Sequence, residues 1–173
     1  NTDTKYTVEY YLQNLAGDGY DKQTPVTELT GKTGAPVNAE EKSFAGFTLD
    51  KSIEGTVASG EIAGDGSLVL KLYYTRNANT AYTVEYYLQD LNGTSYTKSD
   101  TYSEEKIGKT GDEVTVTPKA IDGYAFNEDA EGNKLTGVIS AEDGKKLVLK
   151  LYYDRNTDTK YTVEYYLQNL AGD

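Results

Sequence analysis

The sequence predicts a mainly β protein, α+β at most, built from tandem repeats in an elongated chain. Three observations support this prediction: the octamer Tyr-Thr-Val-Glu-Tyr-Tyr-Leu-Gln occurs three times, segments of each repeat alternate apolar and polar residues, and glycines separate these segments. Alternation with a period of two is typical of strands that bury one face. Self-similarity at a fixed period is typical of repeat architectures.

The repeated octamer sets the domain boundaries. It begins at Tyr6, Tyr82 and Tyr161, and so recurs after 76 and then 79 residues. The sequence is divided into a linker end at 1–5, repeat 1 at 6–77, a linker at 78–81, repeat 2 at 82–156, a linker at 157–160 and the first strand of a truncated third repeat at 161–173. Because residues 156–173 copy residues 1–18 and Asn1 replaces an initiator Met, we expect a fragment of a longer tandem array.

Each repeat begins and ends with a long strand. In the first strand of repeat 1 the residues expected on one face are Tyr6, Val8, Tyr10 and Leu12. In the last strand the corresponding residues are Leu68, Leu70, Leu72 and Tyr74. The segment 38–42 is compatible with a helix, but the aligned segment 115–119 looks extended, so we expect little regular helix. The linkers lack glycine and proline, which favours a fairly rigid connection.

Composition excludes several function classes. The 173 residues carry 17 Lys plus Arg against 28 Asp plus Glu, a net charge of -11, and no Cys or His. The absence of Cys and His excludes thiol chemistry, disulfides, structural zinc sites and imidazole catalysis. The acidic balance does not suit nucleic acid or an anionic membrane as a partner, and no apolar run is long enough for membrane insertion.

Four segments of repeat 1 resemble a known family. They are the opening Tyr-Thr-Val-Glu-Tyr-Tyr-Leu, Leu29-Thr30-Gly31-Lys32-Thr33-Gly34, Phe44-Ala45-Gly46-Phe47 and the closing Leu-Val-Leu-Lys-Leu-Tyr-Tyr. Together they resemble the mucin-binding-protein (MucBP) repeat, which occurs in tandem in cell-wall-anchored surface proteins of Gram-positive bacteria. The resemblance implies a β-grasp-like, ubiquitin-like fold whose first and last strands lie side by side. It also implies a role in cell adhesion and an extracellular location on the bacterial cell surface, with anchoring through a region outside this fragment.

Adjacent first and last strands would place opposite charges side by side on the outer face. Glu9 would lie beside Lys71 in repeat 1, and Glu85 beside Lys150 in repeat 2. An exposed cross-strand pair of this kind contributes about 0.2–1 kcal/mol. We therefore expect these residues to form structural cross-strand pairs.

A parallel register would also pair tyrosines on the same outer face. Tyr11 would lie near Tyr73, and Tyr87 near Tyr152, giving an outward stripe of tyrosines on each repeat. Tyrosine rings stack on sugars and lose little conformational entropy on binding, so these four residues are candidates for ligand contact. The alternative is that each pair only stabilises the sheet.

Two motifs suggest chemistry that their surroundings do not support. Gly-Lys-Thr resembles part of a phosphate-binding loop, but Val26 occupies the position of the earlier glycine that such a loop needs. The acidic segment 127–132 resembles a calcium loop, but Val138 stands where the bidentate glutamate is required. We therefore expect no metal-binding site and no cofactor.

Covalent and catalytic functions find no better support. An isopeptide bond between Lys5 and Asn77 would not be shared by both repeats, because repeat 2 has Ala81 in place of Lys5. No spacing pairs two carboxylates for acid–base catalysis. We expect neither enzyme activity nor catalytic residues.

Two functions remain, and both belong to a surface adhesin. The first is a structural stalk or spacer that projects a distal adhesive region, with neighbouring repeats as the partners. The second is direct binding of mucin or host glycans by each repeat through its outward tyrosines. The loops 21–25 and 97–101 differ in sequence, which favours the stalk, because one ligand bound by both repeats would keep its loop contacts the same.

The partial third repeat carries a separate expectation. A single strand cannot fold alone, so residues 160–173 are expected to be disordered or to pack on a neighbouring molecule by strand exchange. The segment matches the first strand of such a neighbour in sequence.

Overall fold

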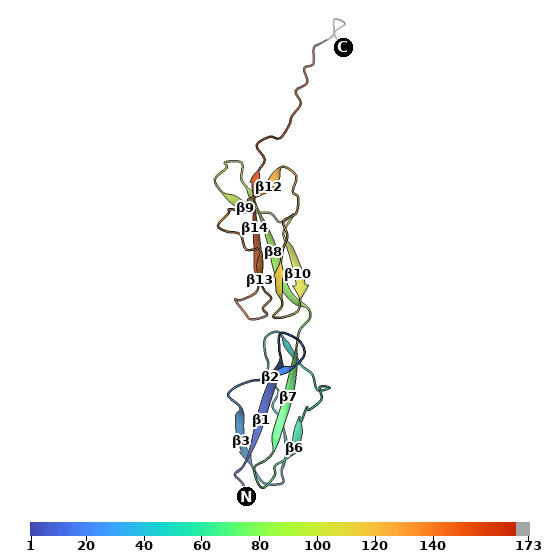
Figure 1. Cartoon of the computed structure of the whole chain (residues 1–173), viewed down its shortest axis with the longest axis vertical. Helices are drawn as coiled ribbons and strands as arrows, with labels where there is room; N and C mark the ends of the chain where they lie inside the picture. The colour runs from blue at the N-terminus through green and yellow to red at the C-terminus, as the bar shows by residue number, and fades with distance from the viewer. Residues whose placement is uncertain (169–173) are drawn as a thin grey trace.

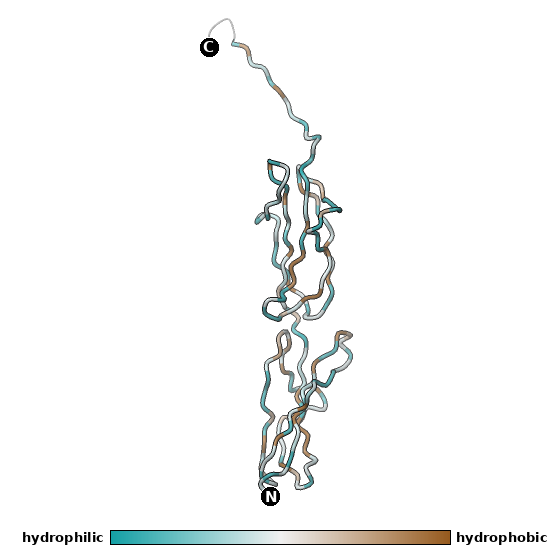
Figure 2. The backbone as a smooth tube through the Cα atoms, turned by 90° about the vertical axis from the view of Figure 1, so that its left-hand side faces the viewer, coloured by the Kyte–Doolittle hydropathy of each residue, from teal (hydrophilic) through white to brown (hydrophobic). Residues whose placement is uncertain are grey.

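The computed structural model describes residues 1–168, and these form two β domains placed end to end (Figure 1). A view turned by 90° shows the same narrow outline (Figure 2). Among the described residues every regular element is a strand, so no helix there is able to span a membrane. The prediction of elongated, mainly β repeats is confirmed.

The two repeats contain corresponding strands. Repeat 1 has β1 (Thr4–Gln13), β2 (Tyr20–Lys22), β3 (Thr27–Gly31), β4 (Pro36–Asn38), β5 (Phe47–Leu49), β6 (Ser59–Glu61) and β7 (Val69–Arg76). Repeat 2 has β8 (Thr80–Gln89), β9 (Tyr96–Lys98), β10 (Glu104–Gly108), β11 (Glu113–Thr115), β12 (Tyr124–Phe126), β13 (Thr136–Val138) and β14 (Val148–Arg155). The segment 38–42 contains no helix: it begins with the last residue of β4 and continues without regular structure.

The first and last strands of each repeat pair in parallel at the centre of the main sheet. β1 pairs with β7, with Tyr10 opposite Leu72, and β8 pairs with β14, with Tyr86 opposite Leu151. β2 and β3 pair with the other side of β1, and β5 pairs with β7; repeat 2 has the same order. The central parallel pair is the arrangement that a β-grasp-like fold requires.

One face of the central strands carries the core of each repeat. The buried apolar residues are Tyr6, Val8, Tyr10, Ile62, Leu70, Leu72 and Tyr74 in repeat 1, and Val84, Tyr86, Ile121, Ile139, Leu147, Leu149, Leu151 and Tyr153 in repeat 2. They include the alternate residues of the long strands, because successive side chains of a strand point to opposite faces. Val37 of β4 and Ile62, just after β6, pack on the core, so the β4–β6 ribbon covers it.

The core tyrosines also hold the irregular segment 39–42. The Tyr10 hydroxyl donates to the carbonyl of Glu40 at 2.8 Å, and the amide of Lys42 donates to the Tyr74 hydroxyl at 3.0 Å. Lys42 Nζ lies 4.2 Å from the centre of the Tyr10 ring, a cation–π contact. Burial raises the pKa of both tyrosines, because it disfavours the charged phenolate.

The connection between the repeats is short. β7 ends at Arg76 and β8 begins at Thr80, so residues 77–79 alone separate the two strands. Thr80 and Ala81, which the sequence analysis assigned to the linker, lie in β8.

The described part of the third repeat, residues 157–168, forms no strand and extends from the end of repeat 2 (Figure 1). Its side chains are exposed, with Tyr161 at 87% and Tyr165 at 88%. The expectation for this segment also covers residues 169–173, which lie outside the described residues. Strand exchange with a neighbouring molecule stays a prediction.

We predict that Gly31→Ala lowers the stability of repeat 1. A Cβ atom at Gly31 would lie 2.5 Å from Ile62 Cδ1. Ile62 is 1% exposed, so a shift of its side chain would disturb the core packed around it. Overpacking of a core costs about 1–3 kcal/mol, so the urea midpoint of repeat 1 should fall. Gly64→Ala is the control, because its Cβ would meet Thr33 Cγ2 at an ordinary 3.5 Å. Equal stability of the two variants would contradict the prediction.

Candidate functional site

Three tyrosines of repeat 1 gather on the sheet face opposite the core, and we call them the outer tyrosine cluster. Tyr11 of β1 and Tyr73 of β7 are opposite each other in register. Their rings stack with centroids 4.7 Å apart and an interplanar angle of 16°. Tyr20 of β2 meets Tyr73 edge-on at 5.2 Å. Aromatic pairs of this kind contribute about 0.5–1.5 kcal/mol beyond their buried area.

Repeat 2 builds the same cluster from Tyr87, Tyr152 and Tyr96. Tyr87 and Tyr152 stack at 4.7 Å and 9°, and Tyr96 meets Tyr152 edge-on at 5.2 Å. The two stacked pairs are those that the parallel register brings together. Tyr96 and its counterpart Tyr20 are not among the residues predicted from the sequence, although Tyr-x-Lys recurs at the start of both short strands, β2 and β9.

The carboxylates of the outer face take different partners from those expected. Glu9 lies opposite Lys71 in register, but its ion pair is with Lys22 of β2, at 3.1 Å. β2 pairs antiparallel with β1 and places Lys22 opposite Tyr11, two residues from Glu9 on the same face. The diagonal contact is therefore within reach of the long lysine side chain.

In repeat 2 the glutamate likewise forms its ion pair with a residue other than its register partner. Glu85 lies opposite Lys150, but its ion pair is with Lys98 of β9, at 3.6 Å. Lys150 Nζ instead lies 5.7 Å from the centre of the Tyr87 ring. The positions of all four residues follow the parallel register, while the ion pairs depend on the short neighbouring strand.

Hydrogen bonds connect each stacked pair to its carboxylate. The Tyr11 hydroxyl donates to Glu9 Oε2 at 2.6 Å, and the Tyr87 hydroxyl donates to Glu85 Oε2 at 2.8 Å. The bond to Glu9, together with burial, raises the pKa of Tyr11 to about 12. In return, the Tyr11 hydroxyl lowers the pKa of Glu9 by stabilising its charged form. These polar groups are thus paired within the fold.

Glycines allow a loop to lie close against the cluster. A Cβ atom at Gly132 would lie 2.5 Å from the ring of Tyr152, and one at Gly55 would lie 3.2 Å from the Tyr73 hydroxyl. The tyrosines of the stacked pairs are accordingly half-buried. The outer face of each repeat is partly covered at its centre, so the predicted stripe of tyrosines is less open than an exposed sheet surface.

Repeat 2 also has a groove of about 270 Å³ that includes Glu104, Lys106 and Lys119 in its lining. The positions matching Glu104 and Lys106 in repeat 1 hold Thr27 and Leu29, as the strand registers show. Glu104 and Lys106 are therefore specific to repeat 2, whereas Lys119 matches Lys42 of repeat 1. Within residues 1–168 no group of three or more His, Cys, Asp or Glu side chains is placed to hold a metal ion.

The structure contradicts the isopeptide bond considered for repeat 1. Lys5 lies near the start of β1, and Asn77 follows the end of β7. Because β1 and β7 run parallel, the two residues lie at opposite ends of the sheet. Their side chains therefore cannot react.

A second site lies where the repeats meet, and we call it the joint. The Asn77 amide donates to the carbonyl of Gly46 in repeat 1 at 2.8 Å, and the Asn77 carbonyl accepts from the amide of Thr110 in repeat 2 at 2.9 Å. The hydroxyls of Thr80 and Thr110 are 2.6 Å apart and share a hydrogen bond. The short linker is thus bonded to the repeat on either side.

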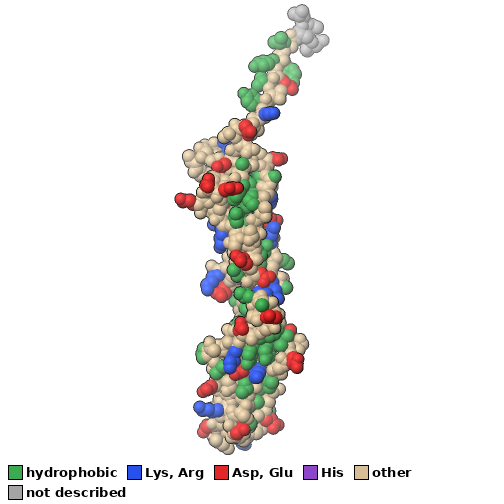
Figure 3. Space-filling view, in the orientation of Figure 1, with side chains coloured by type: hydrophobic (Ala, Val, Ile, Leu, Met, Phe, Trp, Pro, Cys, Tyr) green, Lys and Arg blue, Asp and Glu red, His purple; other side chains and the backbone are tan. Residues whose placement is uncertain are grey.

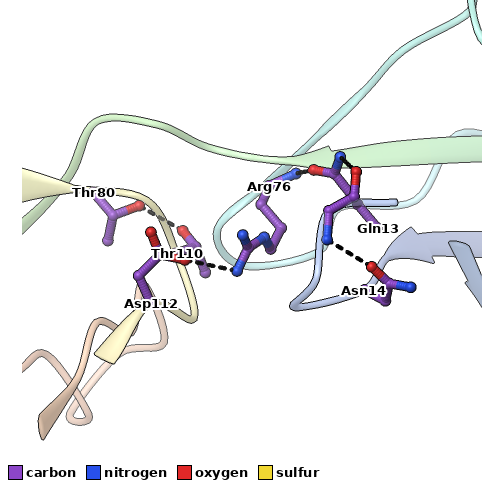
Figure 4. Close-up of polar contacts among 7 residues, drawn as sticks. Gln13, Asn14, Arg76, Thr80, Thr110 and Asp112 are labelled. Carbon is purple, nitrogen blue, oxygen red and sulfur yellow. Dashed lines mark hydrogen bonds and ion pairs between the residues drawn. The ribbon is translucent and has the colours of Figure 1, made fainter. Parts of the chain in front are cut away.

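Side chains cross the joint as well (Figure 4). The Arg76 guanidinium of repeat 1 lies 2.9 Å from the carboxylate of Asp112 in repeat 2, and its side chain is 4% exposed. The Arg76 amide donates to Gln13 Oε1 within its own repeat at 3.2 Å. Leu15 is 69% exposed, but its tip contacts Gly111 of repeat 2, where a Cβ atom would lie 2.6 Å from Leu15 Cδ2. The joint is therefore closed by an ion pair and by packing.

We predict that Tyr11→Phe raises the pKa of Glu9 toward that of an unperturbed glutamate, because the carboxylate loses its hydroxyl donor. A lowered pKa means that the contribution of Glu9 to stability is present above the unfolded-state pKa and is lost as the pH falls through the folded-state pKa. The variant should therefore lose less stability on acidification. Carboxyl NMR titration measures the pKa, and urea unfolding between pH 3 and about 6 measures the stability.

The matched control is Tyr87→Phe, which removes the equivalent hydroxyl from repeat 2. It should leave the titration of Glu9 unchanged. A shift of the Glu9 pKa in Tyr87→Phe, or none in Tyr11→Phe, would refute the local hydrogen-bond explanation.

Comparison with known proteins gives related repeats. The family model described as the MucBP domain matches residues 5–75 and 82–166. Internalin J of Listeria monocytogenes serotype 4b (strain F2365) is 32% identical over 113 residues, which are 65% of this chain and 12% of that protein. The solved type 2 repeat of the mucus binding protein MUB from Lactobacillus reuteri is 12% identical to this chain. The alignment covers 88% of this chain and 100% of the MUB repeat, with a TM-score of 0.27. Since the family model matches both repeats nearly end to end, this chain belongs to the MucBP domain family.

Proposed function

We propose that this chain is a spacer segment of a bacterial cell-surface adhesin, in which repeats in series hold a distal adhesive region away from the cell. The observation that carries the proposal is the joint. Asn77 is hydrogen-bonded to both repeats, and Arg76 of repeat 1 is paired with Asp112 of repeat 2. Contacts on both sides of a three-residue connection limit bending, so each further repeat would add length.

The parallel central strands support the same role. The chain enters a repeat at the start of β1 and leaves it at the end of β7, which points the same way. Entry and exit therefore lie at opposite ends of the repeat, as Figure 1 shows for both domains. Repeats connected in this way extend in one direction and do not fold back.

The charge of the chain suits a crowded surface. Its net charge is -11, and acidic and basic side chains are interspersed over both repeats on the face shown in Figure 3. Because the Debye length is about 8 Å at physiological salt, repulsion acts when neighbouring stalks come close. The acidic balance would keep such stalks apart.

The location follows from the proposed role. Membership of the MucBP domain family supports an extracellular position on the bacterial cell surface and a part in adhesion or mucus binding. We propose that cell-wall anchoring is supplied by a region outside these residues. The curated relative Internalin J is much longer than the matched segment, which leaves room for such regions.

Direct binding of mucin or host glycans is the second candidate function. The outer tyrosine cluster favours it, since Tyr11 and Tyr73 of repeat 1 and Tyr87 and Tyr152 of repeat 2 have the same geometry. A half-buried aromatic surface can stack on sugar rings. Against it, two of these hydroxyls already donate to carboxylates of their own repeat, and loops lie close against the rings.

We predict that the chain shows no saturable binding to immobilised mucin or to a glycan panel at high micromolar concentration. The variant Tyr11→Ala/Tyr87→Ala is measured alongside it, with circular dichroism to show that both proteins are folded. If the spacer proposal is right, both give the same background signal. Saturable binding that the double variant loses would overturn the proposal in favour of glycan binding.

A further inference from the structure

The residues that form each half of the joint recur at the start of repeat 1 and at the end of repeat 2, where the described residues include no folded neighbouring repeat. The half that precedes a joint contains Gly46, Asn77 and Arg76, and its counterpart at the end of repeat 2 contains Gly123, Asn156 and Arg155. The half that follows a joint is the Gly-Lys-Thr-Gly turn of the next repeat, which we call the socket. The chain therefore provides its own comparison between a closed joint and open ends.

Both open halves keep the hydrogen bonds of the closed joint. At the start of repeat 1, Thr33 donates its amide to the Asn1 carbonyl at 2.9 Å, and the Thr4 and Thr33 hydroxyls are 2.6 Å apart. At the end of repeat 2, the Asn156 amide donates to the Gly123 carbonyl at 2.9 Å. Each half is preformed, so its backbone does not need to rearrange when a neighbour docks.

The space that a neighbour would fill is open at these ends. In the closed joint, Cβ atoms placed at Gly46 and Gly111 would lie 2.5 Å and 2.6 Å from atoms of the other repeat. For a Cβ atom placed at the matching Gly123 or Gly34, no described atom beyond the chain neighbours lies within 4 Å. The neighbour that fits each end is thus another repeat of the same kind, seated as repeat 2 is seated on repeat 1.

One residue distinguishes the two sockets. Asp112 follows Gly-Lys-Thr-Gly in repeat 2, whereas Ala35 follows it in repeat 1. In the closed joint Arg76 is buried and pairs with Asp112, and Arg76 Nε has no hydrogen-bond partner among the described residues. The equivalent Arg155 is exposed and donates to the carbonyl of Leu91 in its own repeat.

A buried guanidinium needs a nearby carboxylate, because burial of an unpaired charge is costly. We infer that the residue after Gly-Lys-Thr-Gly determines how firmly a repeat holds the one before it. An aspartate socket, as in repeat 2, draws in the arginine of the preceding repeat and fixes the angle between the two. An alanine socket, as in repeat 1, leaves that arginine in solvent and allows the joint to bend. In an array with both socket types, the residue after each Gly-Lys-Thr-Gly would determine which joints are rigid and which can bend.

The test converts the closed joint into the alanine type. Glu28→Cys and Glu105→Cys place one spin label on an exposed position of each repeat, and the chain has no other cysteine. Pulsed EPR then reports the distribution of distances between the repeats. The doubly labelled chain should give one narrow distribution of distances between the two labels. The same chain with Asp112→Ala should give a broad distribution.

Further variants separate the ion pair from other causes. Arg76→Ala should broaden the distribution as Asp112→Ala does, and the two changes together should add nothing further. Ala35→Asp and Arg155→Ala, the matched changes at the open ends, should leave it narrow. An unchanged width in Asp112→Ala, or equal broadening in Arg155→Ala, would overturn the inference. Unfolding curves for each variant show that both repeats are intact.

The biological purpose of a rigid joint rests on the proposed spacer role, but the distance measurement does not depend on that role. Mucin binding by the outer tyrosine cluster would refute the spacer proposal and leave the distance distributions unaffected. A loose joint in the unmodified chain would refute the inference and leave the binding result unaffected.

Discussion

The parallel pairing of β1 with β7, and of β8 with β14, is the constraint on which the rest of the structure depends. It fixes a shared inner face, where alternate residues of both strands form the core, and a shared outer face, where the tyrosines stack. It also directs the chain out of each repeat at the end opposite its entry. If the first and last strands were antiparallel, the chain would leave each repeat at the end where it entered. A short linker could not then place the repeats in line.

Tyrosine serves two purposes in this fold. On the inner face, Tyr10 and Tyr74 fill the core with their rings and bond the irregular segment 39–42 with their hydroxyls. On the outer face, Tyr11 and Tyr73 cover each other, and Tyr11 bonds the neighbouring Glu9. A small domain without disulfides has a limited core. Residues that combine a large apolar ring with a hydrogen-bonding group stabilise both faces of such a sheet.

The sequence predicts the long strands well, because alternation and repetition are local signals. The stacking of Tyr11 on Tyr73 follows from those signals once the strands are taken as parallel. The ion pair of Glu9 with Lys22 could not be derived in the same way, since β2 has three residues and little periodicity. The burial of Arg76 is still harder to predict from the sequence. Arg76 lies on the same face of β7 as the core residues but beyond the core. Its ion-pair partner Asp112 belongs to repeat 2, so the burial of Arg76 depends on how the two repeats meet.

The direction of the central strands also decides how a repeat resists mechanical load. A pull on the two ends of the array draws β1 toward the start of the chain and β7 toward its end. Parallel neighbours drawn in opposite senses slide past each other, so the hydrogen bonds along the β1–β7 ladder share the force and must break together. Strands that peel apart instead lose their bonds one after another. Resistance to forced unfolding is set by the unfolding rate, and this shearing geometry slows that rate. In a chain of such repeats pulled at its two ends, every repeat would be loaded in this shearing geometry.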